Sequence, residues 1–152
     1  MSSQKLLDFL NQGIAHELQV SIQYMWQSIQ VTGVYGVVTK DIFRETAIAE
    51  MKHAERLADR LDQLDGVPTT KPDDIHVGDS LVEMLTDDER NEEEAIKLYK
   101  EAIQEAAKEG DYTTRRLLEE ILAEEENHAN TFGKLIVGLT EPFTQPETSQ
   151  VG

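Results

Sequence analysis

Residues 49–55 of this 152-residue chain read Ala-Glu-Met-Lys-His-Ala-Glu, and residues 120–128 read Glu-Ile-Leu-Ala-Glu-Glu-Glu-Asn-His. Each stretch carries a glutamate three residues before a histidine: Glu50 precedes His53, and Glu125 precedes His128. Residues three apart lie on one face of a helix, so each pair can reach a single metal ion. Glutamate makes up about one residue in eight of this chain, so the two pairs need support from the rest of the sequence.

The surrounding sequence is typical of long helices. Glu, Leu, Ala, Gln and Lys are plentiful, and the four prolines fall in only two places. Thr86 followed by Glu89 is a helix-start pattern, and Asp111 after Gly110 is a second N-terminal cap. We predict four helices, over residues 4–32, 39–64, 86–109 and 111–138.

The connections between these helices predict how they pack. Gly33 and Gly36 frame a short turn, and Gly110 marks another, so each junction joins two antiparallel helices. The segment 65–85 is long, carries two prolines and suits a crossover along the bundle. The expected fold is an all-α four-helix bundle over residues 1–140, with residues 141–152 as a short extended or disordered tail.

Acidic residues occupy positions on all four helices where a core is expected. The apolar positions repeat in alternating steps of three and four, and each series carries a glutamate near its middle. Burying a carboxylate costs several kcal/mol unless it is paired, and no core position supplies a lysine or arginine. Bound cations balance this charge: four carboxylates match two divalent ions, and oxygen and nitrogen ligands suit iron, manganese or zinc. The alternative is a solvated acidic face without metal. The four glutamates are Glu17, Glu50, Glu92 and Glu125.

Composition excludes several classes of function. The chain has 30 acidic and 14 basic residues and a net charge of −16, which opposes binding to nucleic acid or an anionic membrane. It has no cysteine, so thiolate metal sites and disulfides are excluded. It has no membrane-spanning apolar run and no signal segment, which favours a cytoplasmic protein.

The sequence resembles the ferritin-like superfamily, and most closely the bacterioferritins and their Dps-like relatives. Residues 49–55 match the second-helix motif of that family almost completely, and residues 120–128 match the fourth. Glu17 followed seven residues later by Tyr24 resembles the first-helix motif, and Glu92 followed by Tyr99 resembles the third. The likeness covers residues 3–139, and the four motifs occur in the family's order.

This resemblance implies a di-iron ferroxidase centre. Glu50 and Glu125 would bridge two iron ions; His53 and His128 would each bind one; Glu17 and Glu92 would be terminal ligands. Tyr24, on the same helix face as Glu17, would be a hydrogen-bond or redox partner, or else a plain core tyrosine. Tyr99 has the same two interpretations beside Glu92.

Other positions bear on haem and on assembly. Met51 stands where bacterioferritins carry a haem ligand; it would bind haem at a two-fold interface, or pack there without it. Two prolines in residues 141–152 argue against the fifth helix of 24-subunit ferritins, which favours a 12-subunit shell over a 24-subunit one. His16 and His76 are expected at the surface.

The implied function is oxidation of Fe(II) by O2 or H2O2, with iron storage and detoxification in a homo-oligomeric shell. The alternative is a non-storing di-iron enzyme of the rubrerythrin-like peroxidase type.

Overall fold

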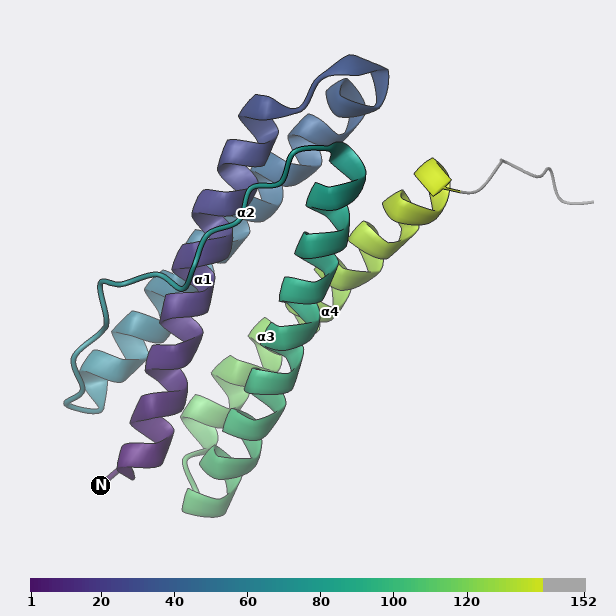
Figure 1. Cartoon of the computed structure of the whole chain (residues 1–152). Coiled ribbons are helices and arrows are strands. Elements are labelled where there is room, and N and C mark those ends of the chain that lie inside the picture. The colour runs from purple at the N-terminus through teal and green to yellow at the C-terminus, as the bar shows by residue number, and fades with distance from the viewer. Residues whose placement is uncertain (141–152) are drawn as a thin grey trace, which may run out of the picture.

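The computed structural model describes residues 1–140, which form four helices and no strand (Figure 1). They are α1 (Gln4–Gln30), α2 (Gly33–Gln63), α3 (Leu81–Glu109) and α4 (Tyr112–Thr140). Their number, order and approximate length agree with the prediction. No helix in this part of the chain is long and apolar enough to cross a membrane.

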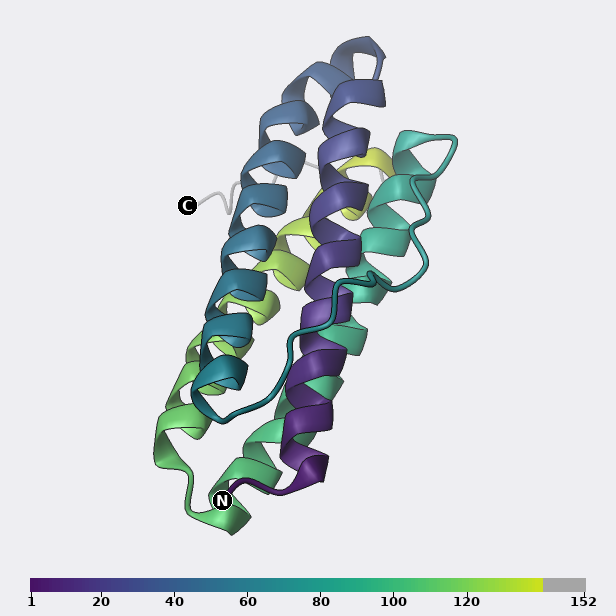
Figure 2. The same cartoon turned by 90° about the vertical axis from the view of Figure 1, so that its left-hand side faces the viewer.

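The helices are arranged as two antiparallel hairpins side by side. α1 packs mainly against α2, and α3 packs mainly against α4. The crossover, residues 64–80, runs back along the bundle from the end of α2 to the start of α3 (Figure 2). The backbone N–H of Asp73 donates to the carbonyl of Ala15 at 3.0 Å, which ties the crossover to the middle of α1. The predicted topology is therefore confirmed.

Two predicted helix starts were wrong, and both helices begin earlier. α2 begins at Gly33 rather than residue 39, because Gly33 takes a φ of 77° that lets the chain reverse within two residues. α3 is capped by Ser80, whose hydroxyl accepts a 3.2 Å hydrogen bond from the N–H of Glu83. Thr86 lies inside α3 instead, and its hydroxyl donates to the carbonyl of Val82 at 2.7 Å.

The start of α4 follows the prediction closely. Gly110 ends α3 in the left-handed conformation, with a φ of 75°, and Asp111 Oδ1 then accepts a 3.0 Å hydrogen bond from the N–H of Thr114. α4 continues to Thr140, two residues beyond the predicted end at Gly138. The expected tail and the expected absence of a fifth helix concern residues 141–152, which lie outside the described residues.

Two apolar clusters fill the bundle and are separated by a polar layer. One cluster is built around Leu57, Leu61 and Leu118; the other is built around Phe43, Phe132 and Tyr24. Along every helix the core glutamate falls between residues of the two clusters. The fold therefore places all four glutamates at the same level of the bundle, which is where the candidate site lies.

Candidate metal centre

All six predicted ligands meet in the polar layer. Each helix contributes a glutamate, and α2 and α4 each add the histidine one turn further on. The four glutamates are fully buried, His53 is 1% exposed, and the His128 side chain is 14% exposed. The structure thus brings together Glu17, Glu50, His53, Glu92, Glu125 and His128.

His53 faces three carboxylates with one ring nitrogen. Its Nδ1 atom lies 2.8 Å from an oxygen of Glu50, 2.8 Å from one of Glu125 and 3.6 Å from one of Glu17. None of these oxygens lies where a ring N–H could donate a hydrogen bond to it. A nitrogen surrounded by oxygens in this way suits a shared cation better than a shared proton.

His128 faces the other side of the same layer. Its Nδ1 atom lies 3.1 Å from Glu50, 3.8 Å from Glu92 and 3.9 Å from Glu125. Burial, together with the charge of His53, lowers the pKa of His128 to about 4. The imidazole is therefore neutral at pH 7, which is the form that binds metal ions.

The ligand atoms form two overlapping groups. Glu17, Glu50, His53 and Glu125 offer atoms that all lie within 4.8 Å of one another, and Glu50, Glu92, Glu125 and His128 do the same. Each group contains one histidine, one carboxylate of its own, and the two shared carboxylates of Glu50 and Glu125. This geometry suits two neighbouring cations joined by two bridging carboxylates.

The electrostatics of the layer also point to cations. Burial raises the pKa of Glu50, Glu92 and Glu125 well above the ordinary value, and repulsion between neighbouring carboxylates raises it further. Several buried oxygens have no hydrogen-bond partner: Glu17 Oε2, Glu50 Oε2, Glu92 Oε2 and both oxygens of Glu125. Unpartnered buried oxygens are costly, so the donor set fits positively charged ligands.

Two tyrosines hold the terminal carboxylates, but in a crossed arrangement. Tyr24 donates a 2.8 Å hydrogen bond to Glu92 Oε1, and Tyr99 donates to Glu17 Oε1. The hydrogen bond of Tyr24 to a core carboxylate agrees with the role predicted for it, but the carboxylate belongs to α3 and not to its own helix. A side chain seven residues away along a helix lies about 10 Å off, whereas α1 and α3 are in direct contact.

One residue near the centre was missed by the sequence analysis. Glu124 Oε2 lies 2.5 Å from His53 Nε2, on the side of the ring that faces away from the cluster. A carboxylate on the second ring nitrogen fixes the orientation of a metal-binding histidine. The run Glu124-Glu125-Glu126 contained the signal, but only the interhelical geometry shows which acid lies in the core.

The remaining candidates lie outside the cluster. Met51 is 46% exposed, so its side chain is available at the surface of α2, and its role in haem binding stays a prediction. His76 has a side chain 63% exposed, as expected. His16 was predicted at the surface but is only 5% exposed, because α1 is covered there by the crossover and by α3.

Comparison with known proteins agrees with this geometry. Residues 7–141 match the family model of the ferritin-like domain. The bacterioferritin of Desulfovibrio desulfuricans is 33% identical over 126 residues, which cover 82% of this chain and 70% of that protein. The bacterioferritin of Rhodobacter capsulatus is 32% identical over 128 residues, covering 83% and 79%.

Solved structures show the same likeness in three dimensions. A ferritin-like, diiron-carboxylate protein from Bacillus anthracis superposes with a TM-score of 0.86 at 31% identity, covering 90% of this chain and 99% of that one. The bacterioferritin of Mycobacterium tuberculosis gives 0.85 at 27% identity, covering 91% and 89%. The match to the family model covers nearly all of the chain. The chain therefore belongs to the ferritin-like domain family, and bacterioferritins are among its relatives.

Proposed function

We propose that this protein oxidises Fe(II) to Fe(III) inside its helical bundle and stores the product in an oligomeric shell. The observation that carries the proposal is the pair of overlapping ligand groups that share Glu50 and Glu125. The curated relatives named above are bacterioferritins, which supports iron as the substrate metal.

Each residue of the cluster has a distinct part in this proposal. Glu17 and His53 hold one Fe(II), Glu92 and His128 hold the other, and the two shared carboxylates bridge them. Four carboxylates neutralise two divalent ions, so substrate binding relieves the repulsion that raises the carboxylate pKa values. Oxidation adds positive charge, which the same carboxylates stabilise.

The redox balance needs two irons and one oxidant. Each Fe(II) gives one electron, and O2 or H2O2 takes the pair with two protons, giving H2O2 or water respectively. Tyr24 and Tyr99 keep the terminal carboxylates in place through their hydroxyl groups, and Glu124 fixes the His53 ring. Burial of the cluster limits the access of bulk water during the reaction.

Storage requires a shell built from many copies of the chain. We infer a homo-oligomer of 12 subunits, with 24 as the alternative, that encloses the ferric product. The surface of a single chain carries exposed apolar residues available for such contacts, including Trp26, Ile29 and Tyr35. Within this assembly, Met51 would bind haem at a two-fold interface.

The test is an aerobic Fe(II) titration followed by size-exclusion chromatography, with iron and protein measured in the same fractions. Tens of irons per chain eluting with a species of many times the 17.2 kDa chain mass would support a mineral-storing shell. Loading that stops at two irons per chain would favour the non-storing di-iron enzyme. A protein that binds no iron would contradict both.

Variants of the shared and terminal ligands test the site itself. Glu50→Ala and His128→Ala are expected to abolish fast iron oxidation, because each removes a ligand from the overlapping groups. Glu55→Ala on the exposed side of α2 is the matched control and should oxidise iron at the parent rate. Parent rates in both ligand variants would show that the reaction occurs elsewhere.

A further inference from the structure

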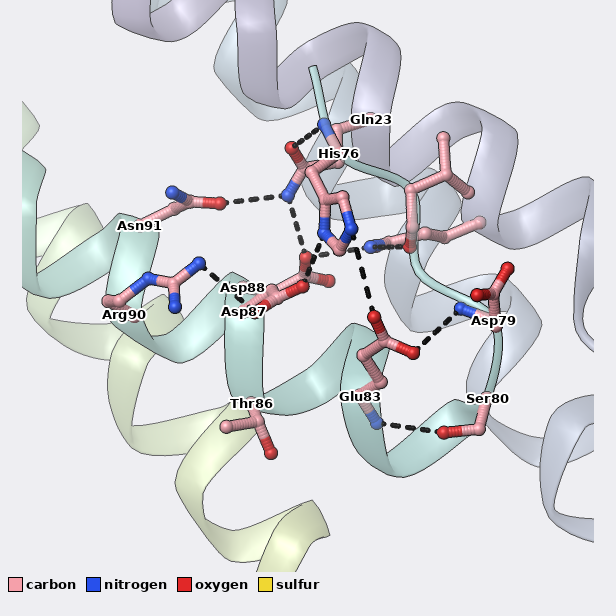
Figure 3. Close-up of polar contacts among 12 residues, drawn as sticks. Gln23, His76, Asp79, Ser80, Glu83, Thr86, Asp87, Asp88, Arg90 and Asn91 are labelled. Atoms are coloured by element: carbon pink, nitrogen blue, oxygen red, sulfur yellow. Dashed lines mark hydrogen bonds and ion pairs between the residues drawn. The ribbon is translucent and has the colours of Figure 1, made fainter. Parts of the chain in front are cut away.

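A second group of metal-binding side chains lies where the crossover meets α3, away from the central cluster. His76 of the crossover and Glu83 and Asp87 of α3 offer ligand atoms within 4.8 Å of one another. Figure 3 shows the imidazole of His76 directed toward both carboxylates. Its Nδ1 atom lies 2.6 Å from Asp87 Oδ2, and its Nε2 atom lies 3.7 Å from Glu83 Oε1.

The two carboxylates are held from their outer sides. Arg90 donates a 3.0 Å hydrogen bond to Asp87 Oδ1, and the backbone N–H of Asp79 donates one of 3.0 Å to Glu83 Oε2 (Figure 3). Each carboxylate therefore presents its other oxygen to His76. Such outer contacts orient the inner oxygens before any ligand arrives, which lowers the cost of binding.

His76 itself is fixed by α1. Its backbone N–H donates to Gln23 Oε1 at 3.1 Å, and the carbonyl of the next residue, Val77, accepts a 2.9 Å hydrogen bond from Gln27 Nε2. Both glutamines are buried, so the crossover is clamped at this point although the imidazole is largely exposed. An ion could thus reach the histidine from solvent while the backbone below it stays in place.

An unpartnered buried carboxylate lies beneath this group. Asp88 is 0% exposed, and both Gln23 and Gln27 donate to its Oδ1 atom, which leaves Oδ2 with no hydrogen-bond partner. Figure 3 shows its carboxylate beside that of Asp87, below the His76 ring. Burial, together with the charge of Asp87, raises the pKa of Asp88 to about 8. Asp88 thus leaves a buried acceptor oxygen without a partner beside this group, and a cation bound nearby would stabilise the charged form of its carboxylate.

The two distances from the His76 ring indicate different roles for Asp87 and Glu83. The 2.6 Å separation is a hydrogen bond between Nδ1 and Asp87, whereas 3.7 Å is too long for a hydrogen bond between Nε2 and Glu83. A nitrogen and an oxygen bound to one tetrahedral ion, each at about 2.1 Å, stand roughly 3.4 Å apart. A carboxylate on the second ring nitrogen is the usual companion of a metal-bound histidine.

We propose that His76 Nε2 and Glu83 Oε1 bind an exchangeable divalent cation at this junction, with Asp87 orienting the imidazole and water completing the coordination. Imidazole, carboxylate and water together suit Zn²⁺, Fe²⁺ or Mn²⁺. The site is separate from the six-residue cluster and shares no residue with it.

Equilibrium dialysis against Zn²⁺, with bound metal measured per chain, tests this site in the full-length protein. Zn²⁺ is used because it does not change oxidation state. His76→Ala and Glu83→Gln should each bind one ion fewer per chain than the parent. Gln keeps the helix-capping contacts of Glu83, so that variant should fold normally. Asp87→Asn should weaken binding without abolishing it, because its amide oxygen still accepts from Nδ1.

The control variants separate this site from the central one. Glu93→Gln removes one exposed acidic charge from α3 without touching the group, and it should bind zinc like the parent. The Glu50→Ala/His128→Ala background still contains Glu17, His53 and Glu125, so the decisive quantity is a difference: adding His76→Ala should remove one zinc ion per chain there, as it does in the parent. Equal zinc binding by parent and His76→Ala proteins would overturn the proposal and identify the group as an ion pair only, whatever the fate of the central site.

Discussion

The polar layer and the two apolar clusters are equally buried, but their side chains differ in what they contact. Phe132 in one cluster meets other rings: its centroid lies 5.4 Å from that of Tyr24 and 6.3 Å from that of Phe43. Glu125, one layer away on the same helix, has two buried oxygens without a hydrogen-bond partner. The apolar clusters therefore hold the helices together, and the polar layer lowers stability until a cation enters it.

This division explains how the bundle tolerates so much buried charge. Apolar packing on both sides fixes the four backbones, so the carboxylates cannot move apart to reach water. The same rigidity sets the ligand spacing in advance, which is the condition for binding two ions at a fixed separation.

Truncation of Phe132 should have the largest effect on folding. Phe132→Ala leaves a cavity among packed rings and should lower the free energy of unfolding by about 3–5 kcal/mol. The measurement is urea unfolding of the metal-free protein followed by circular dichroism. Val137→Ala, at a half-exposed position further along α4, is the control and should change stability little. If Phe132→Ala lowered the free energy of unfolding no more than Val137→Ala does, the aromatic cluster would not be what stabilises the bundle.

A change in the polar layer should act in the opposite direction. Burial, together with repulsion from Glu125, raises the pKa of Glu92, so its charged form destabilises the metal-free fold. Glu92→Gln removes that charge and keeps an acceptor for the Tyr24 hydroxyl; it should stabilise the metal-free protein by about 1–2 kcal/mol.

The same variant should respond less to metal. Added Zn²⁺ should raise the unfolding midpoint of the parent and raise that of Glu92→Gln by a smaller amount, because one ligand is missing. The stability without metal and the shift caused by Zn²⁺ answer one question together. They distinguish a metal site that lowers stability when no ion is bound from a core whose carboxylates are required for folding. A metal-free Glu92→Gln protein less stable than the parent would show that the buried charge of Glu92 does not destabilise the metal-free fold.

Sequence patterns predicted most of this arrangement because helix periodicity is local information. The spacing of Glu50 and His53, and of Glu125 and His128, fixes which face of each helix they share. A crossover of the predicted length leaves few ways to pair the hairpins, so the four glutamates were expected in one layer. The fold and the meeting of the six side chains followed from these two facts.

Two features that the sequence left open or misplaced depend on contacts between distant segments. Tyr24 and Tyr99 bind carboxylates on each other's helix, which no intrahelical spacing reveals. His16 is buried by the crossover, whose path is not periodic. The start of α3 was misplaced for a local reason: the Ser80–Glu83 capping pattern preceded the one chosen at Thr86.

The smallest predicted effect concerns a carboxylate that does have donors. Asp111 caps α4 and lies 2.9 Å from Arg60. Burial would raise its pKa, but hydrogen bonds from Thr114 and the charge of Arg60 outweigh burial and lower it. Asp111→Ala should therefore cost about 1 kcal/mol at pH 7, since it removes a helix cap.

The pH dependence of that effect separates charge from capping. A lowered pKa in the folded state means that the charge of Asp111 contributes fully above the unfolded value of about 3.9, and its contribution disappears as pH falls through the folded value. Asp111→Asn keeps the cap without the charge, so it should cost less than Asp111→Ala at pH 7, and its difference from the parent should shrink at about pH 3. Unfolding curves at both pH values provide the check. An Asn variant as unstable as the Ala variant at pH 7 would mean that Asp111 acts through its ion pair with Arg60 and not as a cap.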